Sequence, residues 1–131
     1  PGYLLGPHLD PKRTTFTVLL YLAREDDPEE LGTDLYRVNG IIRRTGTKTY
    51  YPEEDGLSCV KAKQIPFRPN TILAFLNGGG AHGAMIPRDA PPATARYAYQ
   101  FYVGPDVEQL TTLLATLPPA QHQDWLGLLA E

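Results

Sequence analysis

The chain has 131 residues, of which 42% are hydrophobic and 21% are charged, a composition typical of one globular domain and not of a disordered segment. Its net charge is −3 and its basic residues are scattered, so the sequence has no basic footprint for nucleic acid. No apolar run approaches the roughly 20 residues that cross a bilayer, and the single cysteine, Cys59, excludes an internal disulfide and a thiolate-rich zinc site. We therefore expect a cytoplasmic domain with no membrane segment and no nucleic-acid partner.

Seven short segments are predicted to be β-strands, because β-branched and aromatic residues alternate within them and turn-forming residues bound them. In chain order they span residues 3–5, 14–23, 32–38, 58–65, 70–77, 81–87 and 96–104. Thirteen prolines and twelve glycines supply the turns between them. Many short strands with this punctuation indicate a mainly β fold, either a sandwich or a barrel.

The strand at residues 96–104 has one polar side. Strand alternation places four residues there, and these resemble the wall of a wet pocket: Arg96, Ala98, Gln100 and Tyr102. An arginine that faces inward needs an anionic partner, because a buried unpaired charge is costly. That partner is either a structural Asp or Glu, or the carboxylate of a small ligand, which matches the planar guanidinium. We expect most other aromatic residues of the strands to lie in the core.

Residues 106–117 have apolar side chains at helical spacing, with Asp106 as the N-cap, and residues 118–131 could form a second helix. We expect this helical pair to pack on one face of a sheet. Residues 39–57 fit neither a strand nor a helix, and loops of this length are usually functional or mobile. Their basic residues, Arg43, Arg44 and Lys48, could contact an acidic or peptide substrate, but we interpret them as charges that keep the loop solvated.

Two residues of the stretch GPHLD, His8 and Asp10, have the spacing that puts side chains on the same side of a strand. One imidazole and one carboxylate make two thirds of a metal site, although a His-x-Asp pair alone is common on protein surfaces. His82, after an apolar strand and a glycine run, is the third candidate, whereas His122 lies among polar residues of the tail. Two histidines and one carboxylate on a β scaffold form the facial triad of non-haem Fe(II) sites, while zinc prefers other ligand sets.

In the order PHLD, TVLLYL, GTDLY, RPNTILAFLNGGGAHGA and RYAYQFYV, these motifs resemble the 2-oxoglutarate/Fe(II)-dependent dioxygenase superfamily, and within it the prolyl 4-hydroxylase-like branch. The family pattern is His-x-Asp, then a distal His, then a basic residue further along. The resemblance covers residues 1–104 and implies a double-stranded β-helix, or jelly roll, that lacks the segment usually preceding its first strand. Residues 105–131 would be a C-terminal helical extension of the same domain.

The resemblance implies roles for particular residues. His8, Asp10 and His82 would bind Fe(II), and Arg96 would pair with the distal carboxylate of the co-substrate 2-oxoglutarate. Tyr21 would direct its hydroxyl to that carboxylate, and Leu35 would pack against the co-substrate. Gln100 and Tyr102 would line the pocket near the metal. Arg88 is six residues after His82 and in a turn, so Arg96 is the better match to the basic residue of the pattern.

The activity that the resemblance implies is hydroxylation by O2, with release of succinate and CO2. The substrate would be a protein side chain such as proline, with a small molecule as the other possibility. The aspartate favours hydroxylation over halogenation, because related halogenases have a small residue in its place. The alternative is a non-catalytic jelly-roll module of the cupin type that binds a ligand or a metal and has no need of Arg96 in the pocket.

Overall fold

The computed structural model describes residues 1–44, 48–78, 80–120 and 122. Each of the seven segments predicted as a strand forms one. The strands are β1 (Leu4–His8), β2 (Phe16–Tyr21), β3 (Thr33–Asn39), β4 (Ser58–Ile65), β5 (Ile72–Leu76), β6 (Ala81–Met85) and β7 (Ala98–Val103). Two short 3₁₀ helices, η1 (Glu29–Leu31) and η2 (Pro52–Asp55), and one α-helix, α1 (Val107–Thr116), complete the described elements.

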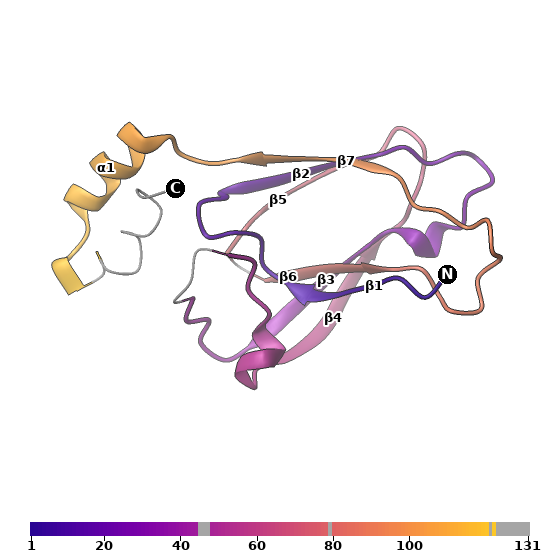
Figure 1. Cartoon of the computed structure of the whole chain (residues 1–131), viewed down its shortest axis with the longest axis horizontal. Helices are drawn as coiled ribbons and strands as arrows, with labels where there is room; N and C mark the ends of the chain where they lie inside the picture. The colour runs from indigo at the N-terminus through magenta and orange to yellow at the C-terminus, as the bar shows by residue number, and fades with distance from the viewer. Residues whose placement is uncertain (45–47, 79, 121, 123–131) are drawn as a thin grey trace.

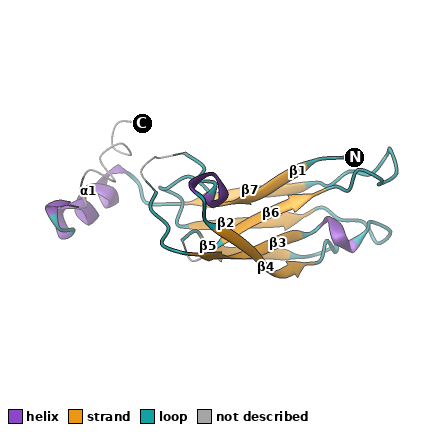
Figure 2. Ribbon diagram, turned by 90° about the horizontal axis from the view of Figure 1, so that it is seen from below, coloured by secondary structure: helices purple, strands orange, loops and turns teal. Residues whose placement is uncertain are grey.

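The strands form two antiparallel sheets that lie one above the other (Figures 1 and 2). One sheet has the order β1-β6-β3-β4, and the other has the order β5-β2-β7. Every pairing within them is antiparallel. The prediction of a mainly β fold is therefore confirmed at the level of a sandwich of two antiparallel sheets. Among the described residues, no helix is long and apolar enough to span a bilayer.

The apolar core lies between the two sheets and is centred on β2. Leu19 and Tyr21 project from the inner side of this strand and are no more than 5% exposed, as are Leu31 from η1 and Phe67 from the chain after β4. The rings of Tyr21 and Phe67 lie 5.1 Å apart in a tilted arrangement, which is favourable for an aromatic pair. This cluster forms one end of the interior and leaves the other end to polar residues.

The expectation that the remaining strand aromatics lie in the core is wrong for the outer side of the sheet β5-β2-β7. Phe16 is 42% exposed, Tyr97 67%, Tyr99 60% and Phe101 51%. The predicted alternation along β7 is confirmed, because Gln100 and Tyr102 lie on the side that faces the cavity, opposite to Tyr99 and Phe101. A period of two separates the sides of a strand but does not say which side faces inward when both have large apolar groups.

The predicted helix at residues 106–117 forms as α1, and the side chain of Asp106 caps it by accepting from the backbone N–H of Gln109 at 2.8 Å. The prediction that it packs on a sheet face is wrong, because α1 lies beyond the end of β7 (Figures 1 and 2). The chain passes close to Arg13 where β7 ends: a Cβ on Gly104 would lie 2.2 Å from the Arg13 carbonyl oxygen. The helix therefore begins at the end of the sandwich. Most of the second predicted helix lies outside the described residues.

Replacement of Leu31 by alanine should lower the free energy of unfolding by about 2–5 kcal/mol, because Leu31 is 1% exposed and its removal leaves a cavity in the core. The matched control is Leu4→Ala, at a side chain that is 73% exposed, and its effect should be within about 0.5 kcal/mol. Urea denaturation of both variants measures the difference. Equal losses would contradict the placement of the core.

Candidate metal centre

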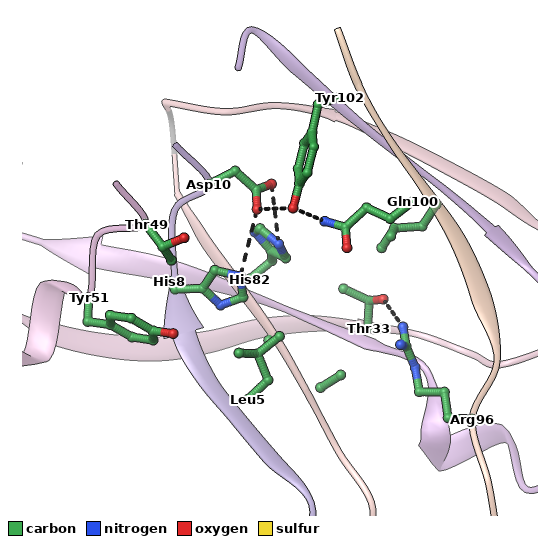
Figure 3. A pocket seen from close by; sticks show the side chains of 13 residues that line it. Leu5, His8, Asp10, Thr33, Thr49, Tyr51, His82, Arg96, Gln100 and Tyr102 are labelled. Atoms are coloured by element: carbon green, nitrogen blue, oxygen red, sulfur yellow. Dashed lines mark hydrogen bonds and ion pairs between the residues drawn. The ribbon is translucent and has the colours of Figure 1, made fainter. Parts of the chain in front are cut away.

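Two histidines from neighbouring strands face each other because β1 contains one extra residue. Leu5 pairs with Ala84 and His8 pairs with His82, so three steps along β1 match two steps along β6. This is a β-bulge, and Pro7, which has no N–H to give to a ladder, lies within it. Directly opposed residues of an antiparallel pair project to the same side, and both imidazoles enter the space between the sheets (Figure 3).

Gly83 allows β6 to approach β1 closely beside this pair. A Cβ at position 83 would lie 2.5 Å from the carbonyl oxygen of Leu5, a distance that no side chain tolerates. The close approach of the two strands thus lies directly after His82. Gly79 lies outside the described residues.

Asp10 completes a cluster of three buried side chains. Its Oδ1 lies 3.9 Å from Nε2 of His8, and its Oδ2 lies 3.6 Å from Nε2 of His82. The ligand atoms of all three residues lie within 4.8 Å of one another, and the residues are 2–5% exposed. The structure thus brings together the three residues that the sequence predicted as metal ligands, and Figure 3 shows them converging on one point.

Hydrogen bonds orient two of these three side chains. Nδ1 of His8 lies 2.9 Å from the carbonyl oxygen of Gly6, which can only accept, so Nδ1 donates and the neutral ring presents the lone pair of Nε2 to Asp10. The hydroxyl of Thr17, which is fully buried, donates to Oδ2 of Asp10. The Tyr102 hydroxyl donates to Oδ1 at 3.4 Å. Burial and the Asp10 charge raise the pKa of Tyr102, so its hydroxyl remains a donor.

The chemistry of these donor atoms fits a divalent cation. The 3.9 Å between Nε2 of His8 and Oδ1 of Asp10 is too long for a hydrogen bond, and in the neutral ring whose Nδ1 donates, Nε2 has no proton to give. Lone pairs therefore face lone pairs across a gap inside the protein. Ligands that share one ion at about 2.1 Å lie about 3–3.5 Å apart, so a small contraction of this cluster would enclose an ion. Two imidazoles and one carboxylate form the facial set typical of non-haem Fe(II).

The backbone of Asp10 is held by side chains that the sequence analysis did not identify. The amide nitrogen of Asn77 lies 3.0 Å from the Asp10 carbonyl oxygen, and it also contacts the carbonyls of Pro11 at 3.1 Å and Thr14 at 2.9 Å. A guanidinium nitrogen of Arg44 donates to the same Asp10 carbonyl. The interpretation of Arg44 as a solvated loop charge is therefore wrong, and burial lowers its pKa.

The described residues 49–51, within the long segment at residues 39–57, form one wall of the site. Leu9 and Tyr50 exchange two backbone hydrogen bonds of 2.8 and 3.0 Å, which pairs the loop with the segment between the ligands His8 and Asp10. Thr49 and Tyr51 consequently line the cavity, as Figure 3 shows. The sequence singled out this loop as functional or mobile but gave no indication of where it would lie.

The three ligand candidates open onto a cavity of about 220 Å³ between the sheets. This volume is roughly that of seven water molecules in the liquid, so the cavity suits a small ligand. Four polar residues were predicted to line this cavity or to bind the co-substrate. Arg96, Gln100 and Tyr102 line it, whereas Tyr21 does not. Gln100 and Tyr102 are also exposed, because β7 is an edge strand, and they mark the mouth.

Arg96 enters the cavity above the aromatic core. Its Nε donates to the carbonyl oxygen of Leu31 at 2.7 Å, and one terminal nitrogen donates to Oγ1 of Thr33 at 3.1 Å. The guanidinium lies 5.5 Å from the centre of the Tyr21 ring and 5.8 Å from that of Phe67. Within the part of the chain that the structure describes, Arg96 forms no ion pair with an Asp or Glu. The structural carboxylate that was one of its two predicted partners is therefore not found there.

Thr33 connects Arg96 with Tyr21. Its Oγ1 accepts from Arg96 and also from the Tyr21 hydroxyl, at 2.6 Å. A hydroxyl oxygen that accepts twice still has its own proton to donate, and Thr33 lines the cavity. Tyr21 is 2% exposed and reaches the cavity only through Thr33. Leu35 is half-buried and pairs with His82 in the sheet, but it is not part of the cavity lining.

Comparison of the chain with protein-family models, with curated proteins and with solved structures gave no match. Functional inference therefore rests on the residues of the site and on the fold that positions them.

Buried His82 should make the metal-free protein less stable in acid. Burial lowers the pKa of His82 from 6.5 to about 4, and repulsion from His8 and Arg96 acts in the same direction while Asp10 opposes it. The unfolded chain therefore binds more protons at this residue between those pH values. The free energy of unfolding should fall as the pH is lowered from 6.5 to 4, and His82 should contribute no slope above this window.

Urea denaturation in the presence of a chelator, from pH 7.5 to 4.5, measures this slope. His82→Gln should give a shallower dependence than the parent chain, because the amide does not titrate. A slope that the substitution leaves unchanged would show that other groups determine the acid response.

Proposed function

We propose that this protein is an Fe(II)- and 2-oxoglutarate-dependent oxygenase that hydroxylates its substrate. The proposal rests on one observation: a buried His-Asp-His cluster and an arginine without a carboxylate partner among the described residues share one small cavity. The first group suits a divalent cation, and the second suits a carboxylate. 2-Oxoglutarate is a ligand of both kinds, since one end chelates a metal and the other is a free carboxylate.

The path of the chain supports the jelly-roll form of the fold. β1 and β6 are neighbours in one sheet, and β2 and β7 are neighbours in the other, although each pair is far apart in sequence. The chain passes from one sheet to the other at every connection except the one between β3 and β4. Pairing of strands that are distant in sequence, with connections that cross between two sheets, is typical of jelly rolls. We interpret the sandwich as the double-stranded β-helix that the sequence motifs resemble.

His8, Asp10 and His82 would hold Fe(II). When bound, the metal supplies the activation of O2 that oxidises 2-oxoglutarate to succinate and CO2 and inserts one oxygen atom into a C–H bond of the substrate. The residues of the chain contribute orientation: Thr17 and Tyr102 fix the carboxylate of Asp10. Because the chain would supply only three ligands, the metal could also bind the molecules that react.

Arg96 and Thr33 would bind the distal carboxylate of the co-substrate. The guanidinium is already oriented by the Leu31 carbonyl and the aromatic rings below it, so little side-chain freedom is lost on binding. Tyr21 has a different role from the one predicted, because its hydroxyl donates to Thr33 and thereby positions the threonine. Leu35 would act only as a packing neighbour of His82.

The substrate would approach through the mouth beside Gln100 and Tyr102, opposite the loop residues Thr49 and Tyr51. An exposed mouth next to the edge strand β7 admits a side chain presented by a protein or peptide, of which proline is one example. A non-catalytic jelly-roll module of the cupin type is the alternative function. It would bind a metal or ligand in the same cavity but would not turn over 2-oxoglutarate.

Anaerobic titration of the metal-free protein with Fe(II) and then 2-oxoglutarate tests the proposal. The chelate should give a weak metal-to-ligand charge-transfer band in the visible range. Asp10→Ala should abolish the band, and Arg96→Ala should raise the co-substrate concentration needed for it by about 10-fold or more, because one charge-assisted pair is lost. Arg88→Ala is the matched control and should leave the titration unchanged.

Metal binding without a band, or a band that Arg96→Ala does not affect, would contradict the co-substrate site and favour a binding module. A band that persists after addition of O2 and candidate peptides, with no succinate formed, would contradict turnover. Succinate formation measured without added substrate reports whether the bound co-substrate is oxidised on its own.

Thr17 should matter for metal affinity although it does not contact the metal. Thr17→Val keeps the shape of the side chain but removes the hydroxyl that orients Asp10, and loss of such a partner typically costs 10- to 100-fold in affinity. Competition with a chromophoric chelator measures the change. Thr15→Val, at the exposed threonine two residues earlier, is the control and should have no effect.

A further inference from the structure

The outer side of the sheet β5-β2-β7 is apolar at every outward position. Each of the three strands contributes three outward residues. Phe16 of β2 pairs with Leu76 of β5 and with Val103 of β7, and the next outward residues follow at every second position along each strand. Nine outward positions hold only aliphatic or aromatic residues. We define the outer face by its six most exposed members, which are 42–66% exposed: Phe16, Ile72, Leu76, Tyr99, Phe101 and Val103.

The area of the outer face is that of a protein interface. At these exposures the six side chains offer roughly 80–130 Å² each, so the face presents about 600 Å² of mostly apolar surface. The largest apolar patch on a typical monomer is about 300–600 Å², and a stable complex buries about 800 Å² on each partner. The outer face together with a rim of neighbouring residues meets this requirement.

We propose that the outer face packs against the outer face of a second copy of this chain. The face has no charged residue with which to select a partner of complementary charge, so its complement must be another flat apolar surface. The chain itself provides such a surface, and a two-fold axis would bring the two together as sheets packed about 10 Å apart. The net charge of −3 opposes an anionic membrane surface as the occupant.

The aromatic residues of β7 suit this packing. The rings of Tyr99 and Phe101 are stacked, with centroids 6.3 Å apart and an angle of 30° between their planes. Rings ordered in this way lose little freedom when covered. The mouth of the cavity lies on the inner side of the same strand, at Gln100 and Tyr102, so pairing through the outer face would leave the cavity accessible. The inference does not depend on the proposed function.

Sedimentation velocity of the full chain between about 1 and 100 μM tests the proposal, with a dimer expected within this range. Val103→Lys places a charge in the outer face and should raise the dissociation constant at least 10-fold. Val60→Lys is the matched control, because Val60 is 54% exposed on β4 of the other sheet and Val103 is 53% exposed. The control should change the dissociation constant by less than two-fold.

Phe101→Lys provides a second probe on the outer face, and circular dichroism together with thermal unfolding identifies any variant that does not fold. The proposal is supported if both folded outer-face variants are monomeric while Val60→Lys remains a dimer. It is overturned if the parent chain is monomeric at 100 μM, if Val60→Lys dissociates the dimer as strongly as Val103→Lys, or if the dimer tolerates both outer-face substitutions. Binding of the monomer to neutral lipid vesicles with no dimer formed would also overturn it.

Discussion

The buried carboxylate of Asp10 is the constraint on which the arrangement of the site depends. At 2% exposure it has lost almost all of its hydration, and an isolated charge in such a place is costly. Thr17 and Tyr102 donate to its oxygens, while Asn77 and Arg44 hold its backbone carbonyl. The imidazole of His82, whose pKa burial lowers, is poorly able to take up a proton. The remaining negative charge is best balanced by a cation, which is why we interpret the cluster as a metal centre.

Arg96 has the opposite problem, a positive charge without a negative partner in the described part of the chain. Its guanidinium has neutral acceptors in Leu31 and Thr33 and two aromatic rings beneath it, but no anion among the described residues. The cavity therefore has a pole that favours a cation and a pole that favours an anion. A ligand that chelates at one end and has a carboxylate at the other would balance both, and this complementarity favours a dicarboxylate keto acid over a simple metal site.

The strands were predictable because alternation is a short-range rule. The cluster of His8, Asp10 and His82 was predictable from the His-x-Asp spacing together with the order of motifs that resembles a known family. Thr17 and Asn77 could not be found this way, since a hydroxyl or amide that bonds to a residue many positions away leaves no periodic signal. The exposure of β7 was missed for a related reason: whether an apolar side faces a core or a partner is decided by what packs on it, which no single strand specifies.

The extra residue in β1 has a second consequence, for self-association of the sheet rather than for the site. β1 is the free edge of its sheet, where unpaired backbone groups can template another strand and start aggregation. A bulge containing Pro7 interrupts that edge, because it twists the strand and removes one N–H from it. Regular pairing of the same sequence from Leu5 onward, without the bulge, would place Pro7 rather than His8 opposite His82 and would also straighten the edge. The bulge thus sets the register of the two histidines and at the same time protects the edge strand from pairing with another chain.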